Sequence, residues 1–112
     1  MVAAVGRIVH YALSDENAAA INKRRKDSGA NLGAIQTDAL GYVAHVGNHA
    51  EAGQVFPLII TRVWSEDCIN GQVLLDGNDS LWLTSASKAN EHQLTQAAGS
   101  PVPGRWFWPP RV

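Results

Sequence analysis

Only one cysteine, Cys68, occurs in the 112 residues, and no long apolar run is present. A single cysteine leaves no partner for a disulfide within the chain, so we expect a reducing compartment such as the cytosol. No segment approaches the roughly 18 consecutive apolar residues that a membrane-spanning helix requires, and the first residues lack the features of a secretory signal. These absences predict a soluble protein without a membrane partner.

An excess of positive charge is also missing. Nine Lys and Arg residues stand against ten Asp and Glu residues, which gives a formal net charge of -1. A long polyanion would meet no global attractive field, so bulk nucleic-acid binding is not expected. The phosphate-loop patterns GxxxxGK and GxGxxG are absent, and neither Ser85 nor Ser87 lies in a nucleophile-elbow pattern. We therefore expect no enzyme activity and no cofactor.

The length and the apolar fraction of 46% predict a single domain, residues 1–112, with its own hydrophobic core. Residues 6–13, GRIVHYAL, alternate in polarity and carry β-branched and aromatic side chains, which favours a first strand.

Residues 14–40 are predicted to form a helical insertion after that strand. Ser14 is a suitable N-cap, two acidic residues follow it, and a run of good helix formers comes next. We expect Ala19 and Ile21 to face the core. Residues 23–26, KRRK, would form a basic helix end that is solvated, or that instead joins a binding site.

From residue 41 onward the pattern indicates strands and turns. Residues 41–48 alternate in polarity, and residues 55–64, VFPLIITRVW, form a long strand pattern in which Pro57 must lie at the start or on an edge. The dipeptide Asn70 and Gly71 predicts a tight turn. We expect it to separate two short strands.

A hairpin is predicted over residues 72–86, with its turn at residues 76–79, DGND. Leu74, Leu81 and Leu83 are the candidates for its core face.

Residues 87–103 are polar and bounded by Pro and Gly, so they are expected to form a connecting loop, and RWFWP then supplies a closing strand. The expected fold is α+β and mostly β. It is a small, strongly bent antiparallel sheet or SH3-like barrel with one inserted N-terminal helix.

Several segments of the chain resemble a known family. HVGNHAEAGQVFPLIITRVW, NGQVLLDGNDSLWLTS and the ending PGRWFWPPRV are similar to small proteins of unassigned function encoded by tailed phages and prophages. The chain departs from the family pattern at Phe107, where the pattern has a histidine. The segment of residues 87–100 is also longer than the corresponding segment of the family. The resemblance implies a viral origin and a site of action in the bacterial host cytoplasm. It implies no catalytic residues.

Aromatic and basic residues gather late in the chain. Arg62 and Trp64 share one face of a strand, as do Trp106 and Trp108. An aromatic face beside guanidinium groups can stack a nucleobase and hold its phosphate. The alternative is that two or three of the tryptophans lie in the core and that Asn78 and Asp79 form the turn. The candidate ligand-binding residues are Arg62, Trp64, Asn78, Asp79, Trp82, Arg105, Trp106 and Trp108.

Two other kinds of site are weaker candidates. His45, His49 and Glu51 have a spacing that can bind a metal on a helix, but Gly47 and Asn48 argue against a helix there. Cys68 lies in no known nucleophile motif, and a lone cysteine is often simply buried. We expect no metal site and no catalytic residue.

The sequence leaves three functions open. The favoured hypothesis is a noncatalytic, homo-oligomeric protein that sequesters a nucleotide immune signal, with the ligand held between subunits. The first alternative is a structural or decoration protein of the virion, in which exposed aromatics anchor an interface. The second is a module that binds and inhibits a host protein.

Overall fold

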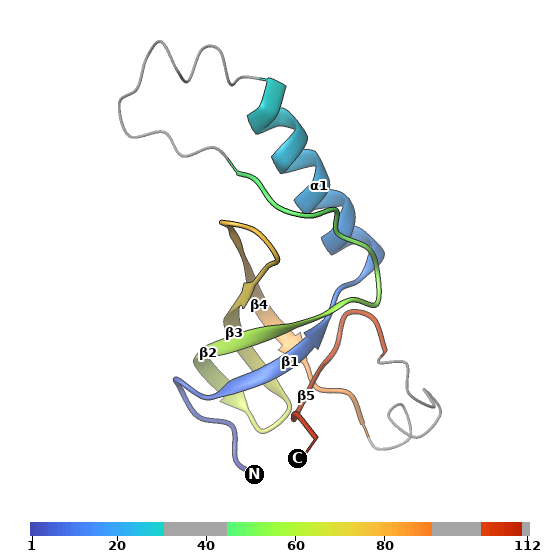
Figure 1. Cartoon of the computed structure of the whole chain (residues 1–112). Helices are drawn as coiled ribbons and strands as arrows, with labels where there is room; N and C mark the ends of the chain where they lie inside the picture. The colour runs from blue at the N-terminus through green and yellow to red at the C-terminus, as the bar shows by residue number, and fades with distance from the viewer. Residues whose placement is uncertain (31–44, 91–101, 111–112) are drawn as a thin grey trace.

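The elements of the fold are five strands and a helix in the part of the chain that the structure describes. The computed structural model describes residues 1–30, 45–90 and 102–110 (Figure 1). In chain order the elements are β1 (Ile8–Ala12), α1 (Asp15–Ala30), β2 (Val55–Ser65), β3 (Cys68–Leu74), β4 (Ser80–Ser87) and β5 (Trp106–Phe107). The predicted α+β, mostly β class is confirmed.

The strands form one antiparallel sheet in the order β4-β3-β2-β1-β5. The sheet curls into a half-barrel, and α1 extends away from one end of it (Figure 1). One row across the inner face pairs Val9 with Leu58 and Leu58 with Val73, and all three side chains are fully buried. The strongly bent, barrel-like sheet predicted from the sequence is therefore confirmed, with its core on the concave face.

β3 runs straight through Asn70 and Gly71, so the predicted tight turn at this dipeptide is wrong. The chain turns instead at Glu66 and Asp67, between β2 and β3. Gly71 serves close packing, because a Cβ there would lie 2.6 Å from the Ile59 carbonyl oxygen and would overlap a neighbouring leucine side chain. Only glycine fits at this crossing of the core.

β2 matches the strand predicted over residues 55–64. Pro57 is the third residue of this strand and pairs with His10 of β1, whereas the pairing with β3 begins one residue later, at Leu58. The proline thus lies near the start of its strand, as the missing N–H requires.

The turn predicted over residues 76–79 joins β3 to β4 as expected. Leu81 and Leu83 pack against the core. Leu74 is 43% exposed, so its prediction as a core residue is wrong. The physical reason is strand alternation, since Val73 already occupies the inward position and its neighbour must point outward.

α1 begins with a reciprocal cap. The Asn17 N–H donates to Ser14 Oγ at 3.1 Å, and the Ser14 N–H donates to Asn17 Oδ1 at 2.9 Å, so the predicted N-cap is confirmed. Ile21 is buried as predicted, but Ala18 rather than Ala19 accompanies it. Residues three apart share a helix face, which places Ala18 and Ile21 together and leaves Ala19 in solvent.

The closing strand is confirmed as β5, although it is only two residues long. Trp106 pairs with Tyr11 of β1, and its carbonyl accepts the Ala89 N–H at 2.8 Å. An isolated parallel bridge joins Lys88 to Trp106. The chain beyond β4 therefore meets β5 and draws the two edges of the curled sheet together.

Some predictions fall partly outside the described residues. The insertion predicted over residues 14–40 is helical as far as residue 30, and residues 31–40 lie outside. Residues 45–48, the described end of the strand predicted over residues 41–48, lie in no strand, and Gly47 forms an isolated bridge with Gly77. Of the connection predicted over residues 87–103, Ser87 belongs to β4, and residues 91–101 lie outside the described part.

Candidate functional site

The eight candidate residues do not form one cluster. The outer face of the sheet carries Arg62, Trp64 and Trp82, the β3–β4 turn carries Asn78 and Asp79, and the C-terminal segment carries Arg105, Trp106 and Trp108.

Arg62 and Trp64 form a preassembled pair on β2. The Arg62 guanidinium carbon lies 3.9 Å from the centroid of the Trp64 ring, so the shared face predicted from alternation brings the two side chains into contact. Trp64 is 53% exposed, yet its indole N–H donates to Asn70 Oδ1 at 2.9 Å. The ring is therefore held in place while much of its surface stays accessible.

Trp82 is the second exposed indole of the outer face, with 58% of its surface accessible. It pairs across β4 and β3 with Gln72, and Gln72 pairs with Ile59 of β2. Their neighbours Val73 and Leu81 pack in the core, so this row lies on the opposite, solvent-facing side. Ile8 continues the row on β1 and is 54% exposed.

Asp79 is engaged by the helix. Its side chain is 1% exposed, and its carboxylate accepts hydrogen bonds from Arg24 Nη2 at 2.9 Å and from Arg25 Nη2 at 2.8 Å. Burial alone would raise the pKa of this carboxyl, but the hydrogen bonds and charges of Arg25 and Arg24 outweigh burial and lower the pKa below its ordinary value. The prediction that residues 23–26 form a solvated end is thus wrong for these two arginines.

Asn78 also has a structural role. Its Oδ1 accepts the Val46 N–H at 2.9 Å, and its own N–H donates to the Val46 carbonyl at 2.9 Å. Gly47 and Gly77 meet beside it, and a Cβ on Gly47 would lie 2.6 Å from the Asp76 carbonyl oxygen. The β3–β4 turn therefore fastens residues 45–48 to the sheet, and the turn-forming alternative accounts for Asn78.

Trp106 is fully buried. Its indole N–H donates to the Ala86 carbonyl at 3.0 Å, and Trp108 lies edge-on to it with 5.9 Å between ring centroids. Trp108 is partly buried and packs against the core. The core alternative therefore accounts for both rings.

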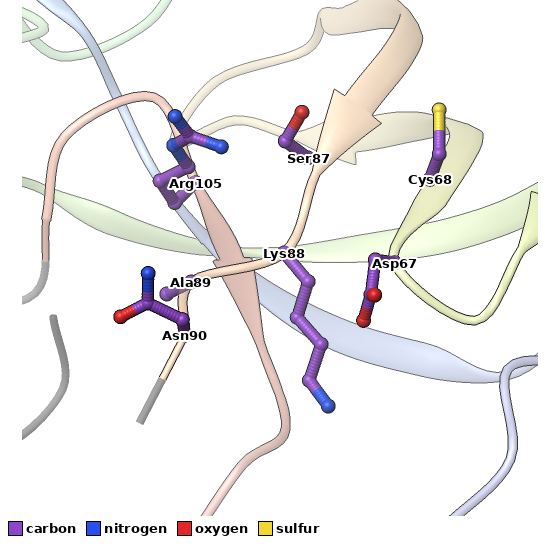
Figure 2. Close-up of a pocket in the computed structure, with 7 residues that line it drawn as sticks. All are labelled: Asp67, Cys68, Ser87, Lys88, Ala89, Asn90 and Arg105. Carbon is purple, nitrogen blue, oxygen red and sulfur yellow. The ribbon is translucent and has the colours of Figure 1, made fainter. Parts of the chain in front are cut away.

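Arg105 lines a cavity of about 420 Å³ at the seam between the end of β4 and the start of β5. The other lining residues are Asp67, Cys68, Ser87, Lys88, Ala89 and Asn90. Figure 2 shows the Cys68 thiol, the Ser87 hydroxyl and the Arg105 guanidinium extending to one side, whereas Lys88 and the Asp67 carboxylate extend to the other. We call this cavity the seam pocket.

The seam pocket borders the outer face that carries the exposed tryptophans. Cys68 pairs with Ser87, and both flank inward-facing core residues, so their side chains point outward. Asn70 follows Cys68 by two positions on the same face and is the residue that holds Trp64. The Trp64 ring and the seam pocket therefore lie on the same face of the sheet, which also carries the buried Asn70.

Sequence reasoning missed Lys88 and Ser87 as lining residues of the pocket, and it missed Asn70 as the partner of Trp64. Their side chains come together only through strand register and closure of the sheet, and the sequence carries no local signal of either. The metal candidates gain no support, because residues 1–30, 45–90 and 102–110 contain no group of three His, Cys, Asp or Glu side chains that could hold an ion.

Comparisons with protein-family models, with curated proteins and with solved structures returned no match for this chain. In the described part of the chain, no helix has both the length and the apolar character that crossing a membrane requires.

Proposed function

We propose that this protein is a noncatalytic binding protein for a nucleotide-like ligand, which stacks on the outer face of the sheet. The observation that carries the proposal is the Arg62–Trp64 pair, with its guanidinium 3.9 Å from the ring centroid and its indole fixed by Asn70. The Arg62 guanidinium lies over one face of the Trp64 ring, so a nucleobase would stack on the guanidinium or on the opposite face of the ring, and the arginine would hold a phosphate.

Trp82 supplies a second exposed ring on the same face of the sheet. Large aromatic side chains usually bury their surface in monomeric proteins, so two indoles that are each more than half exposed favour a role in binding. Asn78, Asp79, Trp106 and Trp108 are left out of the proposed contact surface, because other parts of the fold engage their side chains.

The proposal includes a homo-oligomer. Ligands of nucleotide size are usually enclosed in a concave site, whereas this aromatic pair lies on an open face. A second copy of the chain over that face would enclose the ligand. Together with the resemblance to phage proteins, this suggests a protein that sequesters a nucleotide immune signal in the cytoplasm of the host bacterium.

The test is a binding screen of the purified protein against cyclic dinucleotides, cyclic trinucleotides and ADP-ribose derivatives. A ligand at about a hundred times its dissociation constant should stabilise the fold by about 2.7 kcal/mol, which raises the melting temperature measurably. The mass of the protein in solution should match a closed oligomer. Mass spectrometry of the released ligand should recover it unchanged.

Variants then locate the site. Trp82→Ala and Arg62→Ala should each weaken binding, and loss of a stacking ring should cost about 1–3 kcal/mol. Val46→Ala and Lys26→Ala alter exposed residues elsewhere and should bind as the wild type does. Full binding by both site variants, with the fold intact, would overturn the proposed surface.

The exposed Ile8 and Trp82, which lie in one row with Ile59 and Gln72 on the outer face, favour a second candidate function, because exposed apolar side chains can anchor a protein interface. If no ligand in the panel binds, this row becomes the candidate contact of a virion protein or of an inhibitor of a host protein. Copurification with phage particles would then separate the virion protein from the inhibitor.

A further inference from the structure

The seam pocket is the cavity whose chemistry points most clearly to a ligand class. Arg105 and Lys88 line it, and no carboxylate of the described residues lies within ion-pair distance of either. Among the described lining residues the charged side chains are Arg105, Lys88 and Asp67, and their charges sum to about +1. The described part of the lining therefore has a net attraction for an anion.

The arrangement of the lining residues indicates on which side of the pocket an anion would bind. In Figure 2 the Asp67 carboxylate points away from the side to which Arg105, Ser87 and Cys68 extend. On that side the guanidinium offers several N–H donors and the hydroxyl offers one more, whereas the negative charge lies elsewhere. A tetrahedral oxyanion with several acceptor oxygens matches such a donor set.

The backbone fixes this geometry at the closure of the sheet. The Lys88 N–H donates to the Asp67 carbonyl at 2.9 Å, and the Ala89 N–H donates to the Trp106 carbonyl at 2.8 Å. Arg105 precedes the fully buried Trp106, and its own carbonyl accepts the Ala12 N–H at 3.2 Å. Ser87 therefore lies at the end of β4, and Arg105 directly precedes β5, where backbone hydrogen bonds and the buried Trp106 hold the chain in place.

We propose that the seam pocket is a phosphate subsite, in which Arg105 and Ser87 bind the oxyanion. The identification of the phosphate as part of a nucleotide-like ligand rests on the proposed function. Cys68, which lines this subsite, and Asn70, which holds the Trp64 indole, lie two positions apart on the same face of β3. The ligand class is then a phosphate ester, with its base on the tryptophan and its phosphate at the seam.

The only cysteine of the chain provides a reporter, because Cys68 lines the pocket and is partly accessible. The rate of its alkylation by the small neutral reagent iodoacetamide is measured by intact mass, with increasing inorganic phosphate at constant ionic strength. At about twice its dissociation constant, phosphate should slow the reaction about threefold, because a third of the pockets remain empty. Chloride at the same ionic strength should have no effect.

Arg105→Gln should abolish this protection. Arg7→Gln should retain it, because Arg7 is an exposed arginine that directly precedes β1 and does not line the pocket. Circular dichroism confirms that each variant is folded, and Ser87→Ala provides a second pocket variant in which protection should weaken. If phosphate does not change the alkylation rate of the folded wild type, the phosphate subsite is wrong. Equal protection in the wild type and in folded Arg105→Gln overturns it as well.

A nucleoside and its 5′-monophosphate distinguish failure of the subsite from failure of the proposed function. The monophosphate should both quench tryptophan fluorescence and protect Cys68, whereas the nucleoside should quench without protecting. Protection by inorganic phosphate without quenching by the monophosphate or any other nucleotide tested would leave a site for free phosphate and overturn the nucleotide proposal. Quenching by the monophosphate without protection of Cys68 would keep the proposed function and overturn the subsite.

Discussion

At the scale of the single residue, Asn70 joins the architecture of the sheet to the candidate site. Register shifts occur on both sides of it, in β2 between Ile60 and Arg62 and in the pairing of β3 with β4. Its Oδ1 accepts the Ser85 N–H at 2.7 Å and the Trp64 indole N–H at 2.9 Å. One side-chain oxygen thus replaces a backbone partner at a bulge and orients the exposed ring.

Asn70→Leu should lower the free energy of unfolding by about 1–3 kcal/mol, because it removes the acceptor and leaves two donors to find new partners. Asn70→Asp keeps an oxygen in the same place and should cost less. Urea denaturation gives the stability, and the indole N–H signal of Trp64 in an NMR spectrum should move most in the leucine variant. Equal stabilities for the two variants would contradict this role.

Asn70 and Gly71 also show where local signals fail. The dipeptide favours a turn in an isolated chain, but here tertiary packing decides its conformation. The crossing with β2 excludes a side chain at Gly71, and the bulges need the amide of Asn70. By contrast, the pairing of Arg62 with Trp64 followed directly from alternation, since the two residues are neighbours on one strand face.

At the scale of the elements, α1 is attached to the sheet by a buried ion pair network. Asp79 accepts from Arg24 and Arg25, and the helix is further tied by Asn22, whose side-chain amide donates to the Ala50 carbonyl at 2.8 Å and accepts the Ala50 N–H at 3.0 Å. The start of this helix was predictable, because the capping residue Ser14 lies only three positions before its partner Asn17. The attachment was not, since Asp79 lies 54 residues beyond Arg25 in the sequence.

Asp79→Asn should destabilise the protein by about 3 kcal/mol at neutral pH, because it leaves two arginines without their carboxylate. The pKa of Asp79 is lower in the folded state, so its stabilisation is fully present above the ordinary value of 3.8 and is lost as the pH falls through the folded-state pKa. The stability difference between wild type and variant should therefore be constant near neutrality and shrink below pH 3.8.

Urea denaturation across this pH range measures the difference. Lys23→Gln is the matched control on the same helix, because the Lys23–Asp27 pair is exposed and should contribute little. If the difference in the free energy of unfolding between wild type and Asp79→Asn stays the same down to pH 2, the carboxylate charge does not hold the helix.

At the scale of the whole molecule, the tryptophans divide between two environments, the core that closes the sheet and the outer face. The frequent turns and short strands of the sequence were enough to predict a bent sheet, because these are local properties. The identity of the buried tryptophans was not predictable, since it depends on which edges meet when the sheet closes. Trp106 fills that closure, whereas Trp82 lies on the outer face.

The same substitution, tryptophan to alanine, at each of these two positions compares how much the buried ring and the exposed ring contribute to stability. Trp106→Ala should lower the free energy of unfolding by about 3–5 kcal/mol, because it empties a fully buried position and leaves the Ala86 carbonyl without its donor. Trp82→Ala removes a ring that is 58% exposed and should change stability by about 0.5 kcal/mol or less. Thermal and urea denaturation measure both. Comparable losses would mean that Trp82 is a structural residue, and weaker ligand binding by Trp82→Ala could then no longer be assigned to the loss of a stacking surface.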